Sequence, residues 1–190
     1  MPDSGITVVI PTIEPRAALL ARALASVTWQ TLQPAAVIVE HDRDRSGAAA
    51  TRNRALERVD TEWTAFLDDD DELYPDHLRL LARFARLGGL DVAYPGYDCD
   101  NDPVNMFGIP FSAAFLEQRN FIPVTVLART AAVLEAGGFQ PHPDENGDPC
   151  EDWGLWLAMV RSGARFGHLP QKTWRWHNDV DSTRGRADRW

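Results

Sequence analysis

The sequence predicts an α/β fold in which a mostly parallel central sheet is flanked by helices. Short runs rich in Val, Ile and Phe alternate with longer segments whose apolar residues recur at helical spacing. Runs that are apolar on both faces fit buried parallel strands, and their alternation with helices implies right-handed crossovers. The 190 residues suit one domain, and a hydrophobic share of 44% allows the chain to bury a full core.

The regular part of this pattern lies in residues 1–94. Pro75 is suited to the first turn of a helix, because its missing N–H would have no partner there, and Gly88-Gly89 end that helix. Strands are expected at 6–10, 37–39, 63–67 and 90–94, and helices at 17–30, at 46–59 and from residue 75 to about residue 87.

The pattern becomes irregular after Tyr94. The stretches 95–112 and 140–149 are rich in Pro, Gly, Asn and Asp and are expected to be loops. Thr130 is expected to cap a short helix that Gly137-Gly138 ends. The remaining expected elements are a strand at 121–127, a helix at 151–161 and short strands near residues 166 and 174.

Composition narrows the classes of function. The net charge of −9 disfavours nucleic-acid binding, because an acidic surface repels phosphate. The first residues lack the features of a signal peptide, and no stretch approaches the ~20 apolar residues of a transmembrane helix. Cys99 and Cys150 are too few for a secreted disulfide scaffold. We therefore expect a soluble cytoplasmic protein with two free thiols.

The strongest chemical signal is the acidic run 68–72, which directly follows the strand expected at 63–67. Ligands of open parallel sheets bind beyond the carboxyl ends of the strands. Carboxylates so close together cannot all stay ionised without a counter-cation, and oxygen ligands suit Mg²⁺ or Mn²⁺ shared with substrate phosphates. The alternative is a solvated acidic turn that caps the helix beginning at Pro75. We favour the divalent-metal site.

Six landmarks occur in a fixed order along the chain. They are Val9-Ile10-Pro11-Thr12, Val37-Ile38-Val39-Glu40, Thr51-Arg52-Asn53, the acidic run with Pro75, Gly137-Gly138-Phe139 and Glu151-Asp152. Together they resemble those of the family 2 glycosyltransferases of the GT-A fold, over residues 8 to about 182. The resemblance implies one domain, 1–190, whose half 1–94 binds a nucleotide sugar and whose half 95–190 meets the acceptor. It implies metal-dependent, inverting transfer from a UDP-, GDP- or dTDP-sugar to a hydroxyl, with Mn²⁺ or Mg²⁺.

The same resemblance implies roles for individual residues. Relatives often have Asp-Asp-Gly-Ser where this chain has Glu40-His41-Asp42-Arg43, so the identity of the base stays open. On the donor side, the implied roles are nucleoside contact for Pro11, Thr12 and Glu14, base recognition for Glu40, and donor-nucleotide contact for Arg52. Asp68 and Asp69 are implied to lie near the ribose and sugar. Asp70 and, from the C-terminal side, His177 are implied to bind the metal, and Asp152 is implied to be the catalytic base.

Most of these residues also have a plainer interpretation. Glu40 fits a surface acid at a strand end, and His177, which follows two tryptophans, fits a packed or surface side chain. Arg52 shares the apolar stripe of its helix, so its charge needs a phosphate or an acid as partner, unless the head group reaches water. Acids in a first helical turn favour the helix dipole, which accounts for either Glu151 or Asp152. These two point about 100° apart, so they should have separate roles.

Two rival functions remain at this point. A nucleotidyltransferase typically has a phosphate loop rich in Gly and Lys near its N-terminus, and residues 11–14 lack it. A non-catalytic relative that binds a nucleotide or glycan has the same landmarks. The sequence does not specify the donor sugar, the acceptor or the oligomeric state, and a homo-oligomer is compatible with it.

Overall fold

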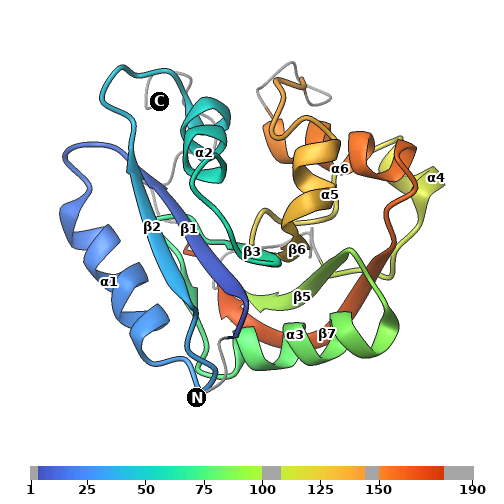
Figure 1. Ribbon diagram of the computed structural model, residues 1–190, viewed down its shortest axis with the longest axis horizontal. Helices are drawn as coiled ribbons and strands as arrows, with labels where there is room; N and C mark the ends of the chain where they lie inside the picture. The colour runs from blue at the N-terminus through green and yellow to red at the C-terminus, as the bar shows by residue number, and fades with distance from the viewer. Residues whose placement is uncertain (1–3, 100–107, 144–149, 178–190) are drawn as a thin grey trace.

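The computed structural model describes residues 4–99, 108–143 and 150–177. One seven-stranded sheet forms its centre, and helices cover both faces (Figure 1). The strands are β1 (Ile6–Thr12), β2 (Ala36–His41), β3 (Trp63–Phe66), β4 (Glu72–Leu73), β5 (Val92–Asp98), β6 (Leu127–Arg129) and β7 (Phe166–Arg175). The helices are α1 (Ala17–Thr28), α2 (Ala48–Leu56), α3 (His77–Gly88), α4 (Ala113–Leu116), α5 (Thr130–Glu135) and α6 (Glu151–Arg161).

The strand order is β2-β1-β3-β6-β5-β7-β4. Strands β2, β1 and β3 are mutually parallel, and β5 is parallel to β7. Strand β6 pairs antiparallel with both β3 and β5, and β4 pairs antiparallel with β7. The predicted α/β fold with a mostly parallel sheet is confirmed, with β4 and β6 as its two reversed strands.

The sheet separates two hydrophobic cores. One core joins Ile6, Val8 and Ile10 of β1 to helices α1 and α3. The other core joins Val9 to helices α2, α5 and α6. Because successive side chains of a strand point to opposite faces, a strand covered on both sides buries all its side chains, and most of them are apolar. This accounts for the run rich in Val and Ile that predicted β1.

The expected strand at 121–127 is wrong. Phe121, Ile122 and Val126 are fully buried, but the strand β6 begins only at Leu127. An apolar run indicates that its residues are buried, but it does not by itself indicate that they pair with a neighbouring strand. The expected cap at Thr130 is also wrong, because its hydroxyl lies 2.9 Å from that of Thr64 and α5 begins without a side-chain cap.

The extents of β5 and β7 also differ from expectation, and two short elements were not expected. Strand β5 continues through Pro95 to Asp98, where a loop was expected, because β7 pairs with it across an irregular register at Pro95 and Gly96. The two short strands expected near residues 166 and 174 are one strand, β7. Strand β4 and helix α4 were not predicted, since two and four residues are too short to show a period.

One side chain of α2 fastens the turn that follows α5. The amide of Asn53 donates from Nδ2 to the carbonyl of Phe139 (2.8 Å), and the N–H of Phe139 donates to Asn53 Oδ1 (2.9 Å). Gly138 lies against this amide with φ +71°, and a Cβ there would be 2.5 Å from Asn53 Oδ1. The landmarks at 51–53 and 137–139 are therefore in direct contact.

Replacement of Gly138 by Ala should destabilise the fold by about 2–4 kcal/mol, because the left-handed backbone and the clash with a hydrogen-bonded amide act together. Gly163→Ala is the matched control, since Gly163 has φ +84° with no atom within 4 Å of an added Cβ. It should lose only the backbone part, about 1 kcal/mol. Urea unfolding of both variants measures the difference, and equal losses would contradict the clash.

Candidate active site

The ends of strands β1 and β3 meet residues of helices α2 and α6 at the carboxyl edge of the sheet. Thr12 ends β1, and residues 68–71 follow β3. The hydroxyl of Thr12 donates to Asp69 Oδ2 at 2.5 Å. Arg52 of α2 reaches both Asp68 and Glu151, the first residue of α6. The acidic run is thus joined to both halves of the chain.

Arg16, which sequence reasoning missed, balances part of this negative charge. Its Nη1 lies 2.8 Å from Asp69 Oδ1, and its Nη2 donates to the carboxylate of Asp70. Arg16 directly precedes α1, in the loop that leaves β1. Its place just beyond the strand expected at 6–10 fits the edge where ligands bind, but nothing in the sequence relates Arg16 to an acidic run 54 residues away.

The acidic turn has more negative charge than its neighbours balance. Burial raises the pKa of Asp69 to about 7, although Thr12 and Arg16 oppose the shift. Burial and then the charge of Asp68 raise the pKa of Asp70. The pKa of Asp71 is raised well above its ordinary value, by burial and then by Asp70 and Asp68. Such carboxylates gain most from a bound cation, because it stabilises their ionised form.

The residues present fit a divalent cation. Asp68, Asp70 and Asp71 each offer a carboxylate oxygen, and these atoms lie within 4.8 Å of one another. Hard oxygen ligands at this spacing suit Mg²⁺ or Mn²⁺. His177 lies outside this group: its Nε2 is 2.5 Å from Glu72 Oε2, and its backbone N–H donates to Asp71 Oδ1 at 3.0 Å. The metal role predicted for His177 gains no support from this arrangement and stays a prediction.

Arg52 is buried and bonded to two acids. Only 3% of the residue is exposed, so the interpretation in which its head group reaches water is wrong. Its Nη2 lies 2.5 Å from Asp68 Oδ1 and its Nη1 lies 2.5 Å from Glu151 Oε1. Burial works against the charged form, but the two carboxylates prevail and raise the pKa of Arg52. Contact with the donor nucleotide stays a prediction.

Asp152 lies beside this ion pair in a different environment. Its Oδ1 accepts hydrogen bonds from Asn120 Nδ2 (3.2 Å), Cys150 Sγ (3.3 Å) and the N–H of Trp153 (2.8 Å). Burial, followed by the charge of Glu151, raises the pKa of Asp152 to about 6. The two neighbouring acids do have separate partners, as predicted. Asn120 and Cys150 were not predicted, because nothing in their spacing relates them to Asp152.

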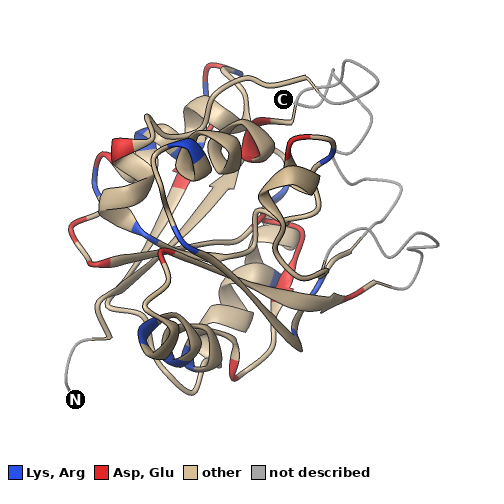
Figure 2. Ribbon diagram, turned by 90° about the vertical axis from the view of Figure 1, so that its right-hand side faces the viewer, with Lys and Arg blue, Asp and Glu red and all other residues tan. Residues whose placement is uncertain are grey.

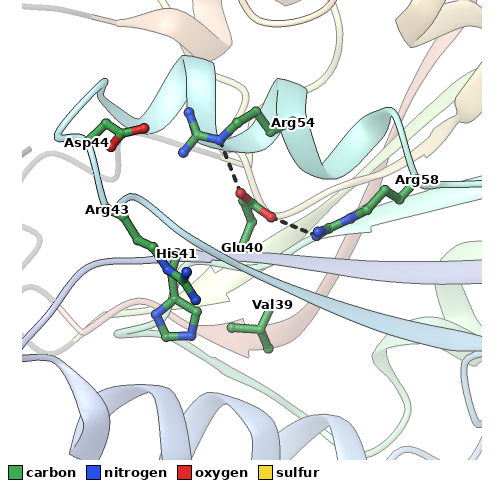
Figure 3. Close-up of a pocket in the computed structure, with 7 residues that line it drawn as sticks. All are labelled: Val39, Glu40, His41, Arg43, Asp44, Arg54 and Arg58. Carbon is green, nitrogen blue, oxygen red and sulfur yellow. Dashed lines mark hydrogen bonds and ion pairs between the residues drawn. The ribbon is translucent and has the colours of Figure 1, made fainter.

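The end of β2 lines a pocket of about 360 Å³ (Figure 3). Glu40 lies between two arginines, with Arg54 Nε 3.1 Å from its Oε1 and Arg58 Nη2 2.7 Å from its Oε2. Glu40 is thus a fixed, largely buried carboxylate and not a freely solvated acid. The pocket is lined by Val39, Glu40, His41, Arg43, Asp44, Arg54 and Arg58.

Other predicted residues are less engaged. The Glu14 side chain is 84% exposed and comes only within 4.0 Å of His41. Pro11 is a buried residue of β1. Trp153, Trp156 and Trp174 are buried and pack in the two hydrophobic cores. Acidic and basic positions are interspersed over helices, strands and loops (Figure 2).

Comparison with known proteins decides the family. The sequence model described as "Glycosyl transferase family 2" matches residues 28–122, half of the chain. The chain belongs to glycosyl transferase family 2. The family assignment agrees with the acidic edge described above and confirms the resemblance seen in the sequence.

Curated relatives point the same way. The succinoglycan biosynthesis protein ExoW of Rhizobium meliloti (strain 1021) is 35% identical over 38% of this chain and 31% of that protein. The putative teichuronic acid biosynthesis glycosyltransferase TuaG of Bacillus subtilis (strain 168) is 36% identical over 63% of this chain and 48% of that protein. The chain thus spans less than half the length of these two relatives.

Solved structures confirm the GT-A fold. The 1–349 portion of S. aureus TarS in complex with UDP-GlcNAc superposes with a TM-score of 0.72 at 17% identity, over 93% of this chain and 59% of that portion. The mannosyltransferase PcManGT from Pyrobaculum calidifontis, in complex with GDP-Man and Mn²⁺, superposes with a TM-score of 0.69 at 15% identity, over 97% and 60%. None of the helices described here combines the length and apolar character needed to cross a bilayer.

Proposed function

We propose that this protein is a metal-dependent, inverting glycosyltransferase that uses a nucleoside-diphosphate sugar. One observation supports this most. Asp68, which clusters with Asp70 and Asp71, is joined through Arg52 to Glu151 at the start of α6, and Glu151 directly precedes Asp152. A cation site for a diphosphate and a carboxylate suited to proton abstraction therefore lie at one edge of the sheet.

The donor half of the site is formed by the ends of β1, β2 and β3. Thr12 and Asp69 line the rim beside the cluster, and Glu40 faces the pocket at the end of β2. TarS was solved with UDP-GlcNAc and PcManGT with GDP-Man and Mn²⁺, which supports a nucleotide sugar as donor. A divalent cation held by Asp68, Asp70 and Asp71 would supply Lewis-acid stabilisation of the departing diphosphate charge.

The chemical step is a single displacement at the anomeric carbon. The acceptor hydroxyl oxygen forms a bond to that carbon while the bond to the diphosphate oxygen breaks, and the diphosphate leaves with the electron pair. Asp152 takes the hydroxyl proton. Its three described donors all bond Oδ1, so Oδ2 is the oxygen on which the proton settles. Attack from the face opposite the leaving group inverts the anomeric configuration.

A thermal-shift and calorimetric screen of UDP, GDP and dTDP with Mn²⁺ or Mg²⁺ tests the donor side. We expect one nucleotide to stabilise the protein only when the cation is present. Incubation of the matching nucleotide sugars with simple sugar acceptors then tests transfer. Release of pyrophosphate from a nucleoside triphosphate and a sugar phosphate would instead identify a nucleotidyltransferase. Binding without transfer or donor hydrolysis would identify a non-catalytic relative.

The rate of transfer should fall as pH decreases through about 6. The pKa of Asp152 is raised to about 6, and the base acts only in its ionised form, so activity is lost below that pH and retained above it. We expect about a tenfold loss per pH unit on the acid side, measured as kcat/KM between pH 4.5 and 8. A profile flat through pH 6 would contradict this role for Asp152.

A further inference from the structure

Arg52 joins parts of the site that lie far apart in the sequence. Its two terminal nitrogens bind carboxylates 16 and 99 residues away, Asp68 on the acidic turn and Glu151 at the start of α6. Its guanidinium also lies 5.2 Å from the centre of the Phe139 ring, whose backbone Asn53 holds by two hydrogen bonds. Four of the six sequence landmarks therefore meet at one side chain.

The guanidinium is poorly accessible to a ligand, because only 3% of Arg52 is exposed. One N–H of Nη1 and one N–H of Nη2 bond carboxylates, and Nε is buried with no partner among the described residues. A planar guanidinium bridging two acids fixes their mutual distance and direction, because its donors are set in a rigid fork. An arginine that binds a diphosphate would instead need a terminal nitrogen directed at the ligand.

We propose that Arg52 is a positioning residue that fixes the metal-binding turn relative to Asp152 by bridging Asp68 and Glu151, and does not itself bind the donor. The inference rests on the proposed glycosyl transfer and deepens it. Asp152 follows Glu151 in the first turn of α6, so the placement of Glu151 sets the placement of the base.

This arrangement matters because the displacement requires three groups to be held in the correct relative positions. The leaving diphosphate is held at the acidic turn, the acceptor oxygen is held by the base, and the anomeric carbon lies between them. A misplacement of about 1 Å costs about 100-fold in rate. Loss of the bridge should therefore lower kcat and leave the affinity for the nucleotide and cation nearly unchanged.

The bridge also sets the charge around the base. Glu151 raises the pKa of Asp152 and Arg52 lowers it, while Cys150 and the Trp153 N–H donate to the same carboxylate and lower it too. The Asn120 amide donates to that carboxylate as well. Removal of Arg52 should shift the acid limb of the pH profile upward, whereas removal of Glu151 should shift it downward. An ion pair remote from the base, such as that of Arg129 with Glu62 and Asp91, would give no such opposite shifts.

The test compares R52Q, R52K, E151Q and the double variant R52Q/E151Q in the full chain. R129Q is the matched control, because Arg129 also pairs with two acids, Glu62 and Asp91, and lies 4.6 Å from the centre of the Trp63 ring, outside the site. The measurements are kcat, KM and the pH profile of transfer, the calorimetric affinity for nucleoside diphosphate with Mn²⁺, and the unfolding temperature. R52K and E151Q keep the test valid if R52Q does not fold.

We expect R52Q and E151Q to lose about 10- to 100-fold in kcat with nucleotide affinity within about threefold of wild type. The double variant should lose no more than the worse single variant, because both remove one bridge. R52K should retain part of the rate, and R129Q should retain all of it.

Two results would overturn the positioning role. One is a tenfold or greater loss of nucleotide affinity in R52Q alone, which would place Arg52 on the donor. The other is rate losses that multiply in the double variant, which would show that the two residues act separately. If the wild type itself neither binds a nucleoside diphosphate nor transfers a sugar, the proposed function has failed, and this result is distinct from either of the other two.

Discussion

Asp152→Asn is expected to lower sugar transfer by about 100- to 10,000-fold while the affinity for the nucleotide and cation stays within about twofold of wild type. The amide is nearly the same size as the carboxylate but cannot take a proton. Its carbonyl can still accept the hydrogen bonds from Asn120, Cys150 and Trp153. Initial rates at saturating donor, together with calorimetry, separate the two effects. Transfer at the normal rate would remove Asp152 from the mechanism.

The same variant should be more stable than wild type at pH 8. Folding raises the pKa of Asp152 from 3.8 to about 6, so the ionised carboxylate costs stability above pH 6 and none below pH 3.8. The gain should be about 1–3 kcal/mol at pH 8 and should shrink as pH falls through 6. Urea unfolding at pH 8 and pH 5 measures it. A variant that is both inactive and less stable at pH 8 would indicate a folding defect, and its inactivity would then not support a catalytic role for Asp152.

Asp70→Ala should weaken cation-dependent binding of nucleoside diphosphate by about 10- to 100-fold. Asp70 is one of three carboxylates whose oxygens lie within 4.8 Å of one another, so its removal leaves an incomplete ligand set. Calorimetry with and without Mn²⁺ measures the loss. Binding with the same dependence on Mn²⁺ as wild type would place the cation elsewhere.

Asp76→Ala provides the matched control for that experiment. Asp76 is an acid of the same segment, but it pairs with Arg79 at 2.9 Å and with Thr31, outside the cluster. The control should retain wild-type affinity and wild-type dependence on the cation. An equal loss in both variants would mean that the effect arises from reduced negative charge in general and not from a specific ligand.

The position of the acidic turn was predictable because two independent signals coincide there. The strand before it is marked by an apolar run, and the carboxyl edge of a parallel sheet is where ligands bind. Arg16 and Asn120 were not predictable in the same way. Arg16 meets Asp70 across 54 residues and Asn120 meets Asp152 across 32, and periodicity contains no information about contacts at such separations.

The errors in the fold have a related origin. Phe121 and Ile122 form an apolar run because the core surrounds them, not because they pair with a neighbouring strand. The strand β6 is only three residues long, and its place in the sheet is set by β3 and β5 on either side. A local pattern predicts which residues are buried, whereas strand pairing depends on partners that a window of sequence does not include.

The position of strand β6 limits where the chain can be truncated. It is inserted between β3 and β5, although both of these strands precede it in the sequence. A fragment ending at residue 94 would therefore leave a gap in the middle of its sheet, with two bare backbone edges open to association with other chains. The parts of the sheet before and after residue 94 are interwoven in space, so fusion or truncation designs should keep residues 63–129 in one piece.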